Sequence, residues 1–166
     1  MIGFLVAFQI LGLVVASSSD PSDKCYFDPL PSIPPSTDHR NIPWGKPTIK
    51  YANGTTCCSS LDEVRDELNN IDAQLLQLLS TRTSYVREAT RFKATVADVN
   101  DPSRNKQVIQ GAVHDAPSVH LPQIVAQKVY EGLINSSVLF EECIFDTYVD
   151  PNKHDNTTGT CHKSTS

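Results

Sequence analysis

The most unusual residue in this sequence is Arg82, because it interrupts a row of apolar side chains. The row recurs at alternating steps of three and four residues, as one face of an α-helix does. Its members are Leu61, Val64, Leu68, Ile71, Leu75, Leu78, Tyr85, Ala89 and Phe92. A buried guanidinium costs on the order of several kcal/mol unless an anion or hydrogen bonds satisfy it. Arg82 therefore predicts an anionic ligand, unless it pairs within the chain or reaches out to water.

Three further cations fall at spacings that fit the same ligand. Lys93 follows Arg82 by three helical turns, so the two side chains share a face with their stems about 16 Å apart and can hold a small dianion. Arg104 lies in the first turn of a later helix, where the positive helix N-terminus adds to its charge. Arg65 lies about 25 Å along the helix from Arg82 and about 100° round it, so it reaches that ligand only from a second chain.

The first of three predicted helices is very long. Ser60–Glu63 forms a capping box, and no proline or glycine follows before about Ala94. Such a helix would be roughly 50 Å long, which is more than a compact chain of this size can cover. Its middle is also apolar on more than one face. We therefore predict an all-α, three-helix fold that forms an intertwined homodimer.

The second and third helices are predicted at 101–113 and 121–148. Asp101 is an N-cap followed by proline at the first helical position, which starts the second helix. The apolar stripe of the third helix includes Ser137 and Glu141, one turn apart. Two more polar groups therefore point toward the interior, unless they lie at an exposed edge of the stripe.

The two ends of the chain differ from the helical domain in composition. Residues 1–16 are typical of a signal peptide, because Phe4–Val15 is apolar, too short to span a bilayer and followed by small residues. We expect a secreted, extracellular protein with no membrane association in its mature form. The helical domain spans 60–148, between a Pro/Ser-rich arm at 17–59 and a polar tail at 149–166. The arm is either loose or fastened to the domain through its cysteines.

The cysteines and sequons agree with an oxidising compartment. The five cysteines are Cys25, Cys57, Cys58, Cys143 and Cys161. An odd number leaves one thiol free or paired with another chain, and the adjacent Cys57 and Cys58 are expected to bond to different partners. Sequons begin at Asn53, Asn135 and Asn156, and the middle one is expected to stay unmodified within its helix.

Other kinds of partner are not expected. The histidines and cysteines lack metal-ligand spacing, so neither a metal nor a cofactor is predicted. The net charge of -5 and the lack of a basic block argue against nucleic acid.

Short motifs in a fixed order carry a resemblance to a known family. They are Leu61–Arg65, Ile71–Asp72, Leu75–Leu79, Arg82, Arg91–Ala94, Asp101–Arg104 and Ser136–Glu141. In this order and spacing, the segment from Ser60 to Tyr148 resembles the all-helical chorismate mutases of the AroQ type and the related isochorismate-pyruvate lyases. The resemblance implies that chorismate, a small dicarboxylate, is the substrate.

The resemblance also implies how the substrate carboxylates are bound. Arg65 of one subunit would act with Arg82 and Arg104 of the other subunit on the two carboxylates. Ser137 matches a small polar residue near one of them. Arg82 would thereby belong to both the binding set and the catalytic set.

The remaining implied roles concern the ether oxygen and the ring hydroxyl. Lys93 would donate to the ether oxygen and to one carboxylate, and Glu141 would face the same oxygen. Asp101 and Asn105 would face the ring hydroxyl. Asn105 departs from the family, since the mutases usually carry Glu there and the lyases an apolar residue.

The sequence therefore predicts a secreted chorismate mutase that rearranges chorismate to prephenate in a cationic cage. This intramolecular reaction needs no nucleophile, metal or general base, only orientation and stabilisation of charge on the ether oxygen. The alternatives are an isochorismate-pyruvate lyase and a non-catalytic secreted interaction protein on the same scaffold. Retention of all four cations, Arg65, Arg82, Lys93 and Arg104, favours an enzyme.

Overall fold

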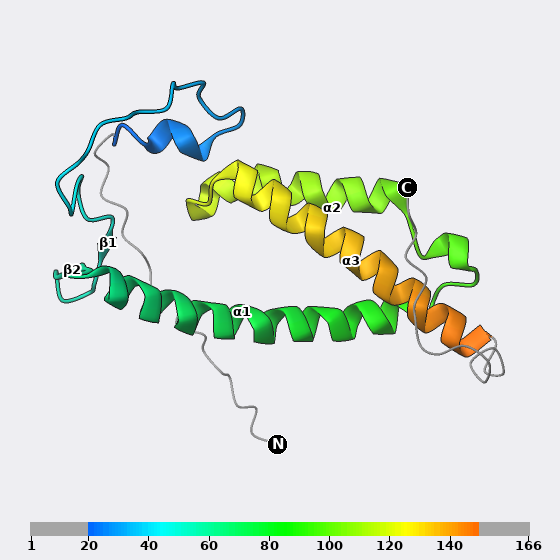
Figure 1. Ribbon diagram of the computed structural model, residues 1–166. Helices are drawn as coiled ribbons and strands as arrows, with labels where there is room; N and C mark the ends of the chain where they lie inside the picture. Colours follow the sequence, from blue (N-terminus) through cyan, green and yellow to red (C-terminus); the bar gives the residue numbers. More distant parts are fainter. Residues whose placement is uncertain (1–19, 150–166) are drawn as a thin grey trace, which may run out of the picture. The chain divides into compact units, whose positions relative to one another are not determined.

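The computed structural model describes residues 20–149, and three helices dominate it (Figure 1). The helices are α1 (Leu61–Thr90), α2 (Pro102–Asp115) and α3 (Gln123–Val149). The smaller elements are the 3-10 helices η1 (Asp23–Tyr26), η2 (Val96–Asp98) and η3 (Ala116–Val119) and the strands β1 (Ile49–Lys50) and β2 (Thr56–Cys57). The predicted all-α fold with a long first helix is confirmed. Within residues 20–149, no helix is long and apolar enough to cross a membrane.

The chain divides into two units at a boundary inside α1. The first unit contains Pro34–Asp72, and the second contains Pro21–Ile33 together with the chain from Ala73 onward. Arg65 therefore belongs to the first unit, and Arg82 belongs to the second. The predicted signal peptide at 1–16, Asn156 and Cys161 lie outside the described residues, as does the tail beyond Val149.

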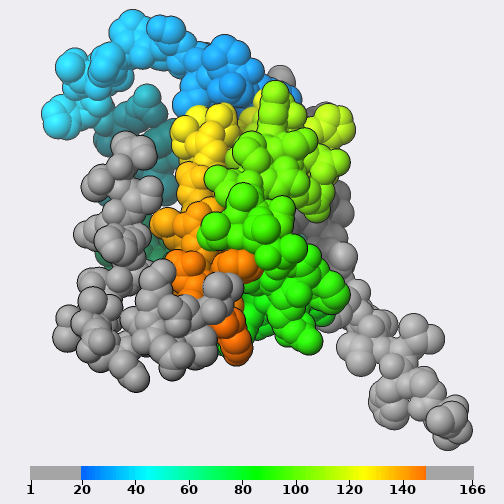
Figure 2. Space-filling model, turned by 90° about the vertical axis from the view of Figure 1, so that its right-hand side faces the viewer, coloured from blue at the N-terminus to red at the C-terminus, as the bar shows by residue number. Residues whose placement is uncertain are grey.

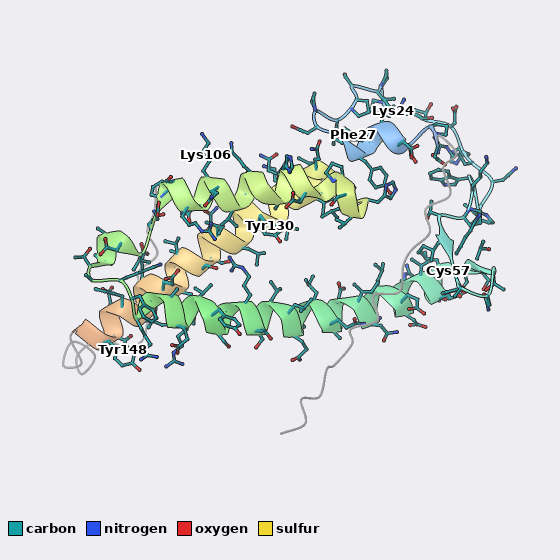
Figure 3. The ribbon with its side chains drawn as sticks, turned by 180° about the vertical axis from the view of Figure 1, so that it is seen from behind. Lys24, Phe27, Cys57, Lys106, Tyr130 and Tyr148 are labelled. Carbon is teal, nitrogen blue, oxygen red and sulfur yellow. A yellow bond between two sulfur atoms is a disulfide. The ribbon has the colours of Figure 1, made fainter. Side chains whose placement is uncertain are left out.

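The first unit holds a small hairpin that leads into α1. β1 and β2 pair antiparallel, with Ile49 opposite Cys57. The prediction that Cys57 and Cys58 bond to different partners is wrong, because they form a disulfide with each other (Cys57 is labelled in Figure 3). The two cysteines are adjacent in sequence, so no other part of the fold is needed to bring them together. Cys25, in contrast, is an exposed free thiol.

Serine side chains cap the start of α1. The Ser60 hydroxyl accepts a hydrogen bond from the Glu63 backbone N–H at 3.1 Å, as the capping box predicts. The Glu63 carboxylate returns to Ser59, one residue earlier than expected, and accepts from its N–H and hydroxyl at 2.8 Å each. These bonds, the backbone one first, lower the pKa of Glu63 because they favour its charged form.

Helix α1 ends at Thr90, four residues before the predicted end near Ala94. The N–H groups of Arg91, Phe92 and Lys93 donate to carbonyls three residues back, which tightens the last turn. Thr95 and Asp98 then form a capping box that begins η2. The sequence contains this Thr-x-x-Asp signal, and a new helical start there prevents α1 from continuing.

Helix α2 runs beside α3, and η3 forms the corner between them (Figure 1). Both helices begin and end within two residues of their predicted limits. The Asp101 side chain accepts from the Arg104 backbone N–H at 3.0 Å, which confirms it as the N-cap of α2. The buried apolar residues of this unit are Val99, Ala116, Ala126 and Ile134.

Residues 21–33 of the arm are fastened to this corner without a disulfide. Tyr26 stacks on His120 with the ring centroids 4.2 Å apart, and the Asp28 N–H donates to the Gln123 side chain at 3.0 Å. Figure 2 shows this blue segment against the yellow start of α3. This part of the arm is therefore fastened by a ring stack and a hydrogen bond, rather than being loose or tethered by a cysteine.

We predict that Asp98 makes the protein more stable at neutral pH than in acid. The Thr95 hydroxyl and then its backbone N–H lower the pKa of Asp98, so this stabilisation is present above the unfolded pKa and is lost as pH falls through the folded pKa. Asp98→Ala should lower Tm at pH 7, and the difference from wild type should shrink below about pH 4. Asp66→Ala on the exposed surface of α1 is the control. Thermal melts that show a pH-independent difference for Asp98→Ala would contradict this role.

Candidate functional site

The buried polar residues in the described part of the chain are Thr90 and Glu141, and they contact each other. Glu141 Oε2 accepts from the Thr90 hydroxyl at 3.1 Å and from the Lys93 ammonium. Glu141 comes from α3, whereas Thr90 ends α1 and Lys93 lies in the turn that follows. The prediction that Glu141 points inward is therefore confirmed, and its carboxylate joins these elements.

Lys93 is held from two sides. Its ammonium is paired with Glu141 and also donates to the Val99 carbonyl at 3.2 Å, just after η2. The side chains of Lys93 and Glu141 are only 22% and 8% exposed, so little water screens the pair. Two of the three ammonium donors are used by these contacts. The position of Lys93 therefore depends on both α3 and the residues beside η2.

Arg82 has a different kind of partner. Its guanidinium is half-buried and donates to the Ser137 hydroxyl at 2.8 Å. Ser137 in turn donates to the Leu133 carbonyl at 2.6 Å. Among residues 20–149, no ion pair involves Arg82. The charge predicted from the sequence is thus turned toward α3 but is met by a neutral hydroxyl.

The two inward cations reach neighbouring turns of α3. Arg82 contacts Ser137, and Lys93 contacts Glu141, four residues later. The prediction that Arg82 and Lys93 share a face of one continuous helix is wrong in detail, because α1 ends before Lys93. The turn after Thr90 nevertheless brings the lysine to the same side of α3 as the arginine. Two positive groups therefore contact Ser137 and Glu141, which together form the polar stripe of α3.

The predicted residues at the start of α2 make local contacts. Asp101 caps the helix, and the Arg104 guanidinium donates to the Gln107 side chain at 2.6 Å. The Asn105 side chain donates to Asn100 at 2.9 Å. None of these bonds reaches Glu141, so the roles given to Asp101, Arg104 and Asn105 stay predictions.

Arg65 also makes a local contact, in the other unit of the chain. Its guanidinium pairs with Asp62 at 2.9 Å, and its side chain is 63% exposed. An exposed pair of this kind contributes little to stability and is readily exchanged. Arg65 can therefore exchange Asp62 for another anion at small cost.

Comparison with known proteins finds a family to which the segment that carries these residues is similar. Residues 64–142 match the family described as chorismate mutase type II. Over this segment, the chain is similar to that family. The match includes Arg82, Lys93, Ser137 and Glu141, and both hydrogen-bonded pairs therefore lie within it.

A curated relative of this chain is named for a different activity. The chain is 38% identical over 47 residues to the isochorismate pyruvate lyase of Pseudomonas aeruginosa. The aligned residues make up 28% of this chain and 46% of the relative. The chain thus spans about half the length of the curated relative that it matches.

The chorismate mutase type II segment also borders a cavity of about 740 Å³. Its lining includes Lys93 and Thr90, with Arg87 from α1 and Arg91 from the turn that follows it. Tyr148, labelled in Figure 3 near the end of α3, forms another part of the wall. Arg82, Ser137 and Glu141 do not line it. The cavity therefore does not include the Arg82–Ser137 contact.

Sequence analysis missed two groups in this arrangement. Thr90 is one of three threonines in α1, and no spacing in the sequence distinguishes it from the exposed Thr81 and Thr83. The Val99 carbonyl that accepts from Lys93 belongs to the backbone, so no residue type could indicate it. The Thr95–Asp98 capping signal is the one sequence feature that could have placed the turn around them.

We predict that the Lys93–Glu141 pair is strongly coupled in folding. A double-mutant cycle with Lys93→Met and Glu141→Leu should give an interaction free energy of roughly 1–3 kcal/mol by urea unfolding, because each single change leaves a half-buried or buried charge unpaired. The control cycle uses Arg91→Met and Glu88→Leu, an ion pair with both side chains more than half exposed. It should give under about 0.5 kcal/mol. Equal coupling in the two cycles would show that burial adds nothing to the Lys93–Glu141 contact.

Proposed function

We propose that this protein is a chorismate mutase that rearranges chorismate to prephenate. The observation that carries the proposal is the half-buried Arg82, whose positive charge is met by a hydroxyl rather than by a carboxylate. A substrate carboxylate would supply the missing anion and could form two parallel hydrogen bonds with the guanidinium. The similarity of residues 64–142 to the chorismate mutase type II family supports the same substrate.

The proposed reaction needs a positively charged cage. In chorismate a C–O bond to the ether oxygen breaks while a C–C bond forms, so no atom of the protein has to attack the substrate. The protein can accelerate this step by holding the compact conformer of the dianion, which lowers the entropic part of the barrier. It can also stabilise the negative charge that grows on the ether oxygen. Arg82 serves the first purpose, and Lys93 serves both.

The Lys93–Glu141 pair sets the state from which the reaction starts. Without substrate, Glu141 and the Val99 carbonyl hold the lysine in place. A bound dianion would compete for Lys93, and Glu141 would then face an oxygen that is gaining negative charge. A protonated Glu141 can donate to that oxygen, whereas its carboxylate would repel it. We therefore expect activity to decline as pH rises and Glu141 loses its proton.

The other cations complete the cage in this proposal. Arg104 would turn from Gln107 to a substrate carboxylate, and Asp101 and Asn105 would lie near the ring hydroxyl. Arg65 would come from a second copy of the chain, since it lies far from Arg82 along one helix. Each site would thus contain residues of two chains.

The apolar row on α1 supports a homodimer. Leu78 and Tyr85 are 68% and 74% exposed in the single chain, and most of the row is exposed with them. Contiguous apolar surface of this kind marks an interface. A second α1 would cover the row and bring Arg65 to the partner's site.

The alternative activity is that of an isochorismate-pyruvate lyase. The curated relative with that name favours it, as does the replacement of the usual mutase glutamate by Asn105. Isochorismate carries the same two carboxylates and the same ether oxygen, so the proposed cage would bind it as well. The two reactions are distinguished by their products, because only the lyase releases pyruvate.

The proposed setting is extracellular. It rests on the signal-peptide pattern at 1–16 and on the sequons, of which Asn53 lies in an exposed turn. Its side-chain oxygen accepts from the Thr55 N–H and hydroxyl at 3.0 and 2.6 Å. The amide nitrogen of Asn53 is the atom that would carry a glycan in this proposal.

We predict that protein beginning at Ser17 converts chorismate to prephenate without releasing pyruvate. Arg82→Ala should lower kcat/KM about 10²–10³-fold with the fold intact, because it removes a preorganised charge. The matched control is Arg87→Ala, which removes an exposed arginine of the neighbouring cavity and should keep near wild-type activity. Pyruvate release from isochorismate would favour the lyase. Loss of activity in Arg87→Ala but not in Arg82→Ala would move the site to the cavity.

We predict that two inactive variants restore each other. Arg65→Ala and Arg82→Ala chains, mixed and allowed to exchange subunits, should recover activity, because a mixed dimer contains one site with both arginines. Mixing Arg82→Ala with Lys93→Ala is the control, since both losses fall in the same half of the site. A monomeric mass by light scattering, or equal recovery in both mixtures, would contradict the shared site.

A further inference from the structure

Thr90 is a buried hydroxyl to which neither the family match nor the curated relative assigns a role. It is the last residue of α1, and its oxygen lies 3.1 Å from the Val86 carbonyl and 3.1 Å from Glu141 Oε2. A threonine hydroxyl has one proton to donate. The two acceptors therefore share a single donor, and Thr90 can turn from one to the other without leaving its buried position.

We propose that Thr90 is a positioning residue that keeps Glu141 Oε2 as a hydrogen-bond acceptor and so leaves Oε1 to carry the catalytic proton. This inference rests on the proposed function, in which a protonated Glu141 donates to the ether oxygen. Thr90 touches neither the substrate nor the reacting atoms in this assignment. It acts through the orientation of the Glu141 carboxyl group.

The contacts of Glu141 support this division of its two oxygens. The hydrogen bonds from Thr90 and Lys93 both end on Oε2. A carboxylic acid has one oxygen that carries the proton and one that only accepts. A proton on Oε2 would compete with two donors already in place, so the proton belongs on Oε1.

Substrate binding makes the orientation of the Glu141 carboxyl group depend more on the Thr90 hydroxyl. Lys93 turns to the dianion in the proposed cycle, and the hydrogen bond from Thr90 then remains as a donor to Oε2. Rotation of the carboxyl group would exchange its two oxygens and turn the proton away from the ether oxygen. The Thr90 hydroxyl opposes that rotation, because it would have to give up its donation to Glu141, turn to the Val86 carbonyl and accept from the carboxyl proton instead.

The same hydroxyl also affects the ionised form of Glu141. A donor to a carboxylate favours the charged state, so removal of the hydroxyl should shift the ionisation of Glu141 to higher pH. The surrounding elements carry other charged groups, which are Lys93 in direct contact, Arg82 on α1, Asp98 in η2, Arg104 on α2 and Glu142 on α3. A substitution at Thr90 alters none of them, so a shift between Thr90 variants isolates the hydroxyl.

The kinetic experiment compares Thr90→Val, Thr90→Ala and Thr90→Ser with wild type over a range of pH, using chorismate. The valine and alanine variants should lose about tenfold in kcat/KM at low pH, the equivalent of one hydrogen bond, and the pH at which their activity declines should be higher than in wild type. Thr90→Ser keeps the hydroxyl and should match wild type in both respects. In a Glu141→Gln background, the amide needs no proton, and Thr90→Val should shift no pH profile. A uniform loss at every pH without a shift would indicate a merely structural role and overturn the proposal.

A second measurement separates this inference from the proposed function. The side-chain carboxyl of Glu141 is followed by ¹³C NMR without substrate, and its signal is assigned by its absence in Glu141→Gln. If wild type turns over neither chorismate nor isochorismate, the proposed enzyme is refuted. A higher ionisation pH in Thr90→Val and Thr90→Ala, but not in Thr90→Ser, would still support the hydrogen bond to Oε2. The same ionisation pH in all folded variants would overturn the role of Thr90 whatever the activity.

Discussion

The contact between Lys93 and Glu141 is the interaction on which the rest of the candidate site depends. It joins the turn after α1 to α3 in a place where little water reaches either charge. Two charges removed from water are costly unless each is well partnered, and here the Val99 carbonyl and the Thr90 hydroxyl supply the further hydrogen bonds. The pair therefore constrains how α1 may end, because only a chain that turns at Thr90 brings all four groups together.

Arg82 and Lys93 differ in how their charges are balanced. The charge therefore differs between the two ends of the polar stripe of α3, which are Ser137 and Glu141. Lys93 meets a carboxylate, whereas the partner of Arg82 within residues 20–149 is a hydroxyl. The Ser137 end of the stripe therefore has an excess of positive charge, and the Glu141 end is close to neutral. A dianion that approaches this stripe gains most from Arg82 first and must then compete with Glu141 for Lys93. The geometry thus favours a ligand with two separated anionic groups over one with a single charge.

The helices and the inward polar residues could be predicted from the sequence, because periodicity and capping are local properties. Arg82, Ser137 and Glu141 each interrupt an apolar stripe, so their spacing made them candidates for inward positions, although an exposed edge of the stripe was the alternative. The end of α1 could not be placed from the same pattern, since the apolar period continues through Phe92 while buried contacts stop the helix at Thr90. The role of Thr90 could not be predicted, because it depends on a hydrogen bond to a residue 51 positions away in the sequence. The disulfide between Cys57 and Cys58 was also mispredicted, since cysteine spacing does not determine connectivity.

The distribution of apolar surface ties the proposed site to the proposed dimer. The buried apolar residues of the second unit are few and mostly small, and a core of this kind gives little hydrophobic stabilisation against the entropy of ordering long helices. The larger apolar side chains lie on the open row of α1, the same helix that carries Arg65 and Arg82. If a second α1 covers that row, association both stabilises the fold and supplies the partner arginine. Folding, assembly and completion of the cage would then be a single event, and a chain that failed to dimerise would lose its stability and its site together.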